Sequence, residues 1–238
     1  MGIKIITLFK LQPGIDDGQF RRYWREDYLP SVLSLREAED AIDRIDFNHS
    51  VPLTIREDMQ MPVPEWAGVS EIWLDSETAG LALLSALDAQ AFQSKHGAVF
   101  SRTVSMPCRE MELWNDGLET PTVKLMAFFL PAATMTRTES QHYWTHDHVR
   151  AGAELTDPRK YAPRYVQNHV LADHHNDNPR LDFAGCPELW FYSRESAVAL
   201  FTEPGEKNMA KLAEDEAVFS DSAKSVALVT DQETVYRR

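Results

Sequence analysis

A histidine near the end of a predicted helix in the second half of the chain is the first candidate for chemistry. His148 follows Trp144 by four residues, which is about one helical turn, so we expect both side chains on the face that points into the core. An imidazole ionises near neutral pH and can donate or accept a proton during a reaction. The pattern predicts His148 as the catalytic acid or base. The alternative is a histidine that only binds a carbonyl group at the helix end.

Two predicted strands of the same half carry further polar groups. Asn168 and His169 are neighbours in a strand, so only one of the two side chains can face the interior. Glu188 lies two residues before Trp190, and a carboxylate buried beside an indole would have the raised pKa of a general base. We predict His169 and Glu188 as additional catalytic residues. The structural alternative for Glu188 is a cross-strand ion pair with Arg164.

Aromatic side chains are expected to form the wall of a binding site. Two of them, Trp73 and Trp190, occupy matching positions in the two halves of the chain. The predicted substrate-binding residues are Tyr28, Trp73, Trp144, Tyr165, Asn168 and Trp190.

The histidines offer no complete metal site at a recognised spacing. His142 and His146 are four residues apart, but no third ligand follows at motif spacing, and we expect a solvated helix face. His174 and His175 lie in a polar segment that is expected to be a loop. The chain also lacks the GxGxxG, Walker, GxSxG and HExxH motifs. We therefore predict neither a metal nor a cofactor.

The elements that must position these residues occur twice. Four residues recur 120 positions later (144 − 24 = 120): Phe9, Trp24, Asn48 and His49 return as Phe129, Trp144, Asn168 and His169. Glu71 and Trp73 return as Glu188 and Trp190 at a spacing of 117 (190 − 73 = 117). A period of this length fits one compact domain. We predict a duplicated domain, with one copy in residues 1–116 and the other in residues 117–238.

Each copy has the predicted order strand, helix, strand, strand, helix, strand. This order is typical of a ferredoxin-like βαββαβ unit, whose sheet carries helices on one face only. The predicted fold class is therefore α+β. Two fused repeats would bury their bare sheet faces against each other in one barrel with a pseudo-two-fold axis. Long loops are expected around 53–67 and 172–184, and a break of the last helix at Gly205.

Three segments of the chain resemble the EthD domain, a family of the dimeric α+β-barrel superfamily. They are Phe20–Glu26, Tyr165–Val170, and Glu188–Trp190 followed by Ser193. The resemblance implies two tandem EthD-like domains that act on apolar aromatic or polyketide-like molecules without metal or flavin. It also implies a functional histidine at the position of His148. Tyr28 replaces this histidine in the first copy, and Val149-Arg150 replaces the family's Gly-Pro in the second.

Three functions are compatible with these residues. The first is a cofactor-free lyase or isomerase that decarboxylates, dehydrates or cleaves a small apolar or phenolic molecule, with His148 moving the proton. The second is a cofactor-independent monooxygenase of a phenolic substrate. The third is a binding protein without turnover. Oxygen dependence separates the first two, and binding without conversion supports the third.

Bulk composition narrows the partners and the location. The formal net charge is −13, which repels nucleic acid and anionic membranes, so neither is an expected partner. The two cysteines, Cys108 and Cys186, are too few for a disulfide scaffold and are expected in the core. No signal peptide or membrane-spanning segment is recognisable, and we predict a cytoplasmic protein. A homodimer of the fused barrel is a possible assembly.

Overall fold

The computed structural model describes residues 2–57, 59–61 and 63–238 and shows an α+β protein with two compact units. The first unit consists of Met1–Ser50, Val63–Arg109 and Gln232–Arg238. The second unit consists of Val51–Pro62 and Glu110–Asp231. Each unit thus takes a short segment from the other half of the chain.

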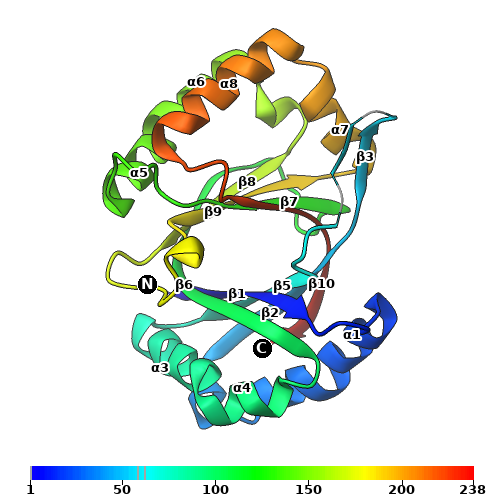
Figure 1. Ribbon diagram of the computed structural model, residues 1–238, viewed down its shortest axis with the longest axis vertical. Coiled ribbons are helices and arrows are strands. Elements are labelled where there is room, and N and C mark those ends of the chain that lie inside the picture. Colours follow the sequence, from blue (N-terminus) through cyan, green and yellow to red (C-terminus); the bar gives the residue numbers. More distant parts are fainter. Residues whose placement is uncertain (1, 58, 62) are drawn as a thin grey trace. The chain divides into compact units, whose positions relative to one another are not determined.

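Antiparallel strands form the sheet of the first unit, in the order β6–β1–β5–β2 (Figure 1). They are β1 (Ile3–Leu11), β2 (Ile42–Ser50), β5 (Gly68–Leu74) and the first part of β6 (Phe100–Asn115). The helical segments are α1 (Asp17–Tyr23), the π-helical turn η1 (Trp24–Tyr28), α2 (Leu29–Leu33), the 3-10 turn η2 (Arg36–Ala38), α3 (Glu77–Asp88) and α4 (Gln90–His96). Asp16 begins α1 with a capping box, in which its side chain accepts a hydrogen bond from the Gln19 backbone.

The second unit has the same succession of elements. Its strands, in the order β8–β9–β7–β10, are β7 (Val123–Phe128), β8 (Arg164–Val170), β9 (Gly185–Phe191) and the first part of β10 (Val226–Arg237). Its helical segments are α5 (Arg137–Tyr143), the π-helical turn η3 (Trp144–His148), α6 (Val149–Leu155), the 3-10 turns η4 (Pro158–Lys160) and η5 (Pro179–Leu181), α7 (Arg194–Thr202) and α8 (Glu206–Phe219). Thr136 and Glu139 form the corresponding capping box at the start of α5.

Strands β6 and β10 each pass through both units. The eight strands are hydrogen-bonded neighbours in the closed order β1–β5–β2–β10–β7–β9–β8–β6, an antiparallel barrel. The predicted α+β class with a barrel is confirmed at this level, and the finer description as two ferredoxin-like repeats stays a prediction. Within the described residues, no helix combines the length and the apolar character needed to cross a membrane.

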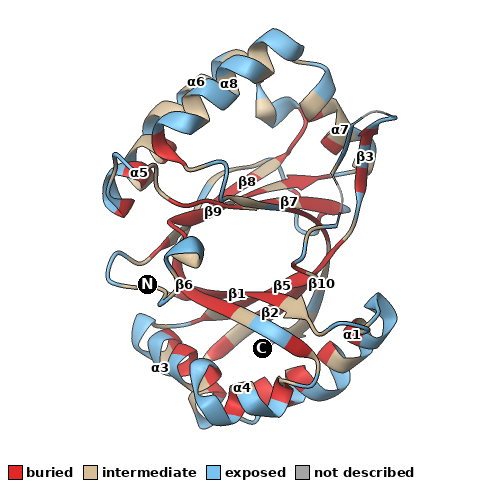
Figure 2. Ribbon diagram, in the orientation of Figure 1, coloured by how far each residue is buried: buried red, intermediate tan, exposed pale blue. Residues whose placement is uncertain are grey.

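Alternation along the strands separates two kinds of side chains. In β8, His169 faces the helices and stacks on Trp144, with 4.8 Å between ring centroids. Its neighbour Asn168 points to the other face and binds Glu188. The prediction that Asn168 and His169 cannot share a face is therefore confirmed. Most strand residues are buried, whereas the helices expose their outer sides (Figure 2).

The last helix of each half is interrupted. In the second half, Gly205 separates α7 from α8 and adopts a φ of 82°, which a glycine tolerates without strain. This break was predicted from the glycine. In the first half, α3 ends at Asp88 and α4 begins at Gln90. No glycine or proline marks this second break in the sequence, and the break was not predicted.

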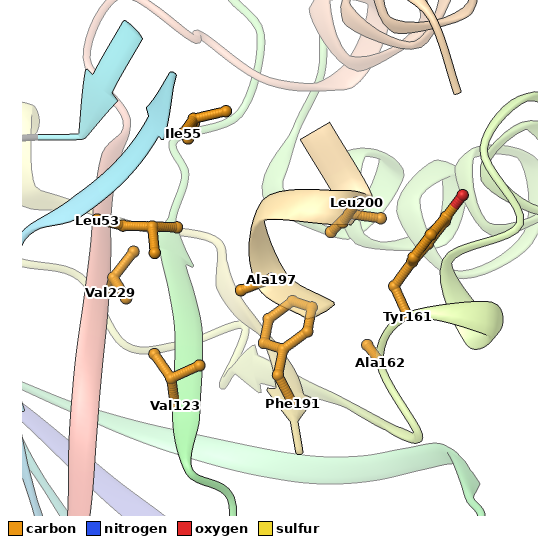
Figure 3. Close-up of a cluster of buried hydrophobic side chains, with 9 residues drawn as sticks. All are labelled: Leu53, Ile55, Val123, Tyr161, Ala162, Phe191, Ala197, Leu200 and Val229. Carbon is orange, nitrogen blue, oxygen red and sulfur yellow. The ribbon is translucent and has the colours of Figure 1, made fainter. Parts of the chain in front are cut away.

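The segment predicted as a long loop around 53–67 contains a hairpin. Strand β3 (Leu53–Arg56) pairs antiparallel with β4 (Met59–Met61). Leu53 and Ile55 are buried and pack with residues of α7, β7, β9 and β10 in one apolar cluster (Figure 3). The loop prediction was wrong because it overlooked the apolar and polar alternation from Leu53 to Arg56, which is typical of a half-buried strand.

A lysine–glutamate pair is completely buried in the sheet of the first unit, on the face away from the helices. Lys4 Nζ lies 2.7 Å from Glu71 Oε1, and the two side chains are 1% and 0% exposed. Asn48 Nδ2 donates to Glu71 Oε2 at 2.9 Å. Lys4 and Arg44 lie 4.5 and 4.6 Å from the centre of the Trp73 ring. These contacts offset the cost of taking the two charges out of water.

The second unit repeats this arrangement. Lys124 Nζ lies 3.0 Å from Glu188 Oε2, and both side chains are 0% exposed. Asn168 donates to Oε1 of the same carboxylate at 2.5 Å, and Trp190 Nε1 donates to Oε2 at 3.0 Å. Lys124 and Arg164 lie 4.6 and 4.1 Å from the centre of the Trp190 ring. The two lysines are also 120 positions apart (124 − 4 = 120), a correspondence that was not among the predicted ones.

The predicted alternative for Glu188, an ion pair with Arg164, is wrong. Glu188 pairs with Lys124, whereas Arg164 Nε lies 2.6 Å from Glu112 Oε2. The register explains the difference, because Arg164 lies opposite Trp190 and Glu188 lies opposite Val166.

We expect Glu188→Gln to destabilise the protein strongly, because Lys124 would stay charged and buried without its carboxylate. The expected loss in the free energy of unfolding is about 3–5 kcal/mol. The double variant Lys124→Met/Glu188→Gln should recover most of this loss, since neither charge remains. Urea denaturation measures both, and a single variant as stable as the unmodified protein would contradict the prediction.

His49 of the first unit is buried without a hydrogen-bond partner. Its ring is 1% exposed and lies 5.0 Å from Trp24 and 5.8 Å from Phe20 between ring centroids. Neither ring nitrogen has a partner in the described part of the chain. Burial lowers the pKa of His49 from its ordinary value of 6.5 to about 4, so the ring is neutral at pH 7.

This burial makes stability depend on pH in a defined window. Below pH 6.5 the unfolded chain binds a proton on His49 that the folded protein binds only below about pH 4, so stability falls as the pH drops between these values. We expect His49→Leu to lie within about 1 kcal/mol of the unmodified protein at pH 7 and to gain about 2 kcal/mol on it at pH 5. Urea denaturation at both pH values tests this. A stability difference that is the same at both values would refute it.

Candidate functional site

The segment that carries His148 is a π-helical turn, η3. A π-helix has more residues per turn than an α-helix, so the angle between the side chains of Trp144 and His148 differs from that in an α-helix. Trp144 packs against the sheet, whereas His148 turns toward α8. The two side chains thus contact different neighbours, and the prediction that both face the core stays a prediction. The first unit contains the equivalent turn η1, and no residue pattern in either copy announces it.

His148 forms a hydrogen-bonded pair with Asp215 of α8. His148 Nδ1 lies 2.7 Å from Asp215 Oδ2, and the side chains are 19% and 18% exposed. The Tyr143 hydroxyl donates to Asp215 Oδ1 at 2.8 Å, and this hydrogen bond, together with burial, raises the pKa of Tyr143. Phe219 packs against the His148 ring, with 4.9 Å between centroids. The Asp215 carboxylate thus accepts hydrogen bonds from two side chains.

The second ring nitrogen of His148, Nε2, forms no hydrogen bond with any residue that the structure describes. Because Asp215 accepts the proton on Nδ1, the lone pair of the neutral ring is on Nε2. A carboxylate that orients an imidazole and stabilises its protonated form is the arrangement of a general base.

Asp215 and Tyr143 were not among the predicted site residues. Asp215 corresponds to His96 in the first half (215 − 96 = 119), and Tyr143 corresponds to Tyr23 (143 − 23 = 120). In the first unit the Tyr23 hydroxyl lies 2.8 Å from His96 Nδ1. Both units therefore place a hydrogen-bonded pair here. Because the matching residues differ in type, the structure and not the sequence repeat identifies Asp215.

Tyr28 occupies the position of His148 in the first unit and has a different environment. It is 3% exposed, and burial raises the pKa of its hydroxyl. Its ring contacts those of Phe9, Phe47, Phe92, His96 and Phe100. This closed aromatic cluster favours a structural role, and the predicted contact of Tyr28 with substrate stays a prediction.

Three of the predicted residues meet between the helices and the sheet of the second unit. Trp144 Nε1 donates to the Tyr165 hydroxyl at 2.9 Å, and His169 stacks on Trp144. The Gln167 side-chain amide lies 3.0 Å from the Tyr165 hydroxyl, from Thr145 Oγ1 and from His169 Nε2. Burial raises the pKa of Tyr165 and lowers the pKa of His169 to about 4. Gln167 and Thr145 were not predicted.

The remaining predicted residues lie on the opposite face of the sheets. Asn168, Glu188 and Trp190 belong to the buried pair of the second unit, and Trp73 belongs to that of the first. Both carboxylate oxygens of Glu188 already accept hydrogen bonds. This environment favours a structural role for all four, and their predicted functions stay predictions.

The other histidines lie at the surface. The rings of His142 and His146 stack at 4.3 Å between centroids, and His146 Nδ1 lies 2.9 Å from the His142 carbonyl oxygen. His175 lies in the loop before β9, 3.0 Å from Asp182. Within residues 2–57, 59–61 and 63–238, no group of three or more His, Cys, Asp or Glu side chains could hold a metal ion.

Two surface hollows of the second unit lie away from these residues. One, of about 300 Å³, is lined by residues that include Met135, Asp182 and Lys224. The other, of about 400 Å³, lies between β3 and the start of α7. Neither is lined by a predicted site residue, and the His148–Asp215 pair reaches solvent between η3 and α8 instead.

Comparison with solved structures identifies proteins of similar fold. An anthrone oxidase-like protein matches with a TM-score of 0.58 and 8% identity, over 98% of this chain and 93% of the other. A candidate monooxygenase from Fusobacterium nucleatum matches with a TM-score of 0.52 and 8% identity, over 99% and 93%. A mutant chlorite dismutase from Candidatus Nitrospira defluvii matches with a TM-score of 0.51 and 8% identity, over 98% and 92%. At these identities the matches show the fold alone.

Sequence comparison is more specific. None of the curated proteins matches the chain. The model of the EthD domain matches residues 132–223, a range that contains both His148 and Asp215. Residues 132–223, in the second half of the chain, are therefore similar to the EthD domain family.

Proposed function

We propose that the EthD domain of this chain abstracts a proton from a small phenolic molecule or aromatic ketone, with His148 as the base. The observation that carries the proposal is the 2.7 Å hydrogen bond between Asp215 and His148 Nδ1, which leaves Nε2 without a partner among the described residues. Asp215 acts as the positioning residue. Such a pair can remove a proton near neutral pH because the carboxylate stabilises the imidazolium that forms.

The surroundings of this base favour an apolar aromatic ligand. Phe219 contacts His148, and the ring centroid of Phe129 lies 5.3 Å from that of Phe219. Phe129 in turn contacts Trp144 at 4.9 Å. Aromatic side chains next to a few polar groups are typical of sites that bind planar, largely apolar molecules.

The anion left after proton removal determines the overall reaction. A phenolate or enolate is electron-rich and can react with dioxygen. For a methylene group between two aryl rings, Ar₂CH₂ + O₂ → Ar₂C=O + H₂O balances without a further redox partner. The names of two structural neighbours, an anthrone oxidase-like protein and a candidate monooxygenase, favour this outcome. A lyase or isomerase reaction begins with the same proton transfer and is the alternative.

We also propose that the chain is a tandem duplication, with EthD-like repeats in 1–116 and 117–238, and that only the second repeat is catalytic. In the first repeat, Tyr28 replaces the base and His96 replaces Asp215. The first repeat would then serve to complete the fold.

We expect His148→Ala to lower kcat by about 10²–10⁴-fold, because a positioned base is lost. His146→Ala is the matched control, since that ring stacks on His142 at the surface. Turnover is measured as oxygen uptake and product formation with anthrone and a panel of phenols, in air and under nitrogen. Conversion under nitrogen would favour a lyase or isomerase. Full activity of His148→Ala would refute its role as the base.

Asp215→Asn tests the positioning role separately. Its side-chain amide can donate to Nδ1 and so place the ring proton on Nε2, and we expect kcat to fall by about 10- to 10⁴-fold. KM should change little, because Asp215 contacts the base and not the ligand. Tyr143→Phe leaves the carboxylate in place and should keep kcat closer to that of the unmodified enzyme. A kcat of Asp215→Asn equal to that of the unmodified enzyme would contradict the assignment.

A further inference from the structure

A series of hydrogen bonds leads from the Trp144 indole through Tyr165, Gln167 and Thr145 to the Gln141 carbonyl group. The two ends of this series fix which groups donate. Its first group, the Trp144 indole N–H, can only donate, and it donates to the Tyr165 hydroxyl at 2.9 Å. At the other end, Thr145 Oγ1 lies 2.9 Å from the backbone carbonyl oxygen of Gln141, which can only accept. The Gln167 amide lies between these ends, 3.0 Å from the Tyr165 and the Thr145 hydroxyl oxygens. The orientation of the Gln167 amide decides which group donates in each of these hydrogen bonds.

Counting protons decides between the two orientations of the Gln167 amide. With Nε2 toward Tyr165, as in the structure, the tyrosine oxygen accepts twice, and its own buried proton has no acceptor among the described residues. The one proton of Thr145 must then serve both Gln141 and Gln167. With the amide turned over, Tyr165 donates to Oε1 and Thr145 accepts from Nε2, so each proton of Trp144, Tyr165, Thr145 and the Gln167 amide has an acceptor. A buried donor without an acceptor is costly, which favours the turned amide.

The turned amide also fixes the proton of His169. His169 Nε2 lies 3.0 Å from the amide atom that faces it. If that atom is the nitrogen of Gln167, it donates, and the neutral imidazole must carry its own proton on Nδ1. The His169 ring is only partly buried, and Nδ1 is not among the enclosed atoms that lack a partner. The Nδ1–H group is therefore within reach of a ligand.

We propose that His169 is a neutral hydrogen-bond donor of the EthD domain, and that its Nδ1–H binds a phenolate, enolate or carbonyl oxygen of the ligand. The identity of that ligand rests on the proposed function, because proton removal creates such an oxygen anion. A neutral imidazole keeps its proton while it stabilises developing negative charge. Burial lowers the pKa of His169 to about 4 and so keeps the ring neutral at pH 7.

The first unit has apolar residues at two positions of this hydrogen-bond series. Ile45 and Phe47 stand at the positions of Tyr165 and Gln167 there. Both nitrogens of His49 are accordingly buried without a partner among the residues that the structure describes. The oriented histidine is thus a feature of the second copy, in which the EthD match and the His148–Asp215 pair also lie.

The protonated nitrogen can be measured directly. In protein labelled with ¹⁵N-histidine, long-range ¹H–¹⁵N correlation spectra at pH 7 should show His169 protonated on Nδ1. Gln167→Glu presents only acceptors and should move the proton to Nε2, and Gln167→Met should give a mixture of both forms. His49 is the internal control and should keep its signals in both variants. A His169 ring protonated on Nε2 in the unmodified protein would overturn the proposal, whether or not the variants fold.

Binding of an oxygen anion is tested with 4-nitrophenolate at pH 8. We expect the probe to shift the His169 Nδ1 resonance in the unmodified protein, to leave His49 unmoved, and to have no such effect in Gln167→Glu. A His169 resonance that does not respond to the probe would refute the binding role. Neither measurement needs turnover, so this failure is distinguishable from failure of the proposed base, which is judged by the activity of His148→Ala.

Discussion

The buried lysine–glutamate pair is the constraint on which both sheets depend. Each pair is 0–1% exposed and is completed by an asparagine from the neighbouring strand, Asn48 or Asn168. A charge without its partner in such a place would cost several kcal/mol, so only the register that joins all three residues is stable. That register also fixes the opposite face of each sheet, because a slip of one residue would exchange the two faces. The side chains that meet the helices are positioned by this choice.

The helix face of the sheet is where the two units differ. In the first unit it holds a closed aromatic cluster, with Trp24 stacked on Phe47 at 4.2 Å and Tyr28 buried nearby. In the second unit, Tyr165 and Gln167 introduce hydrogen-bonding groups at the same depth. Buried polar groups are tolerated only when their partners are supplied, and the second unit supplies them. Two units with the same succession of elements thus differ in the polarity of the space between helices and sheet.

The π-helical turn connects this difference to the proposed chemistry. Within this short segment, Trp144 faces the sheet while His148 faces α8. The aromatic rings of Phe219 and Phe129 lie between the base and the stacked pair of Trp144 and His169. The proposed proton acceptor and the proposed oxygen-binding group thus flank one apolar cluster.

The sequence by itself determined the α+β class, the duplicated order of elements, the capping boxes and the break at Gly205, because these follow from local patterns. It also identified the EthD resemblance and singled out His148. Only the tertiary structure decided what these residues contact. Asp215 comes from a helix 67 positions away, and Lys124 reaches Glu188 from the neighbouring strand β7. His148 also lies in a π-helical turn that the sequence pattern did not predict. Partners distant in the chain and local helix geometry are set by the folded core, and no short sequence pattern encodes them.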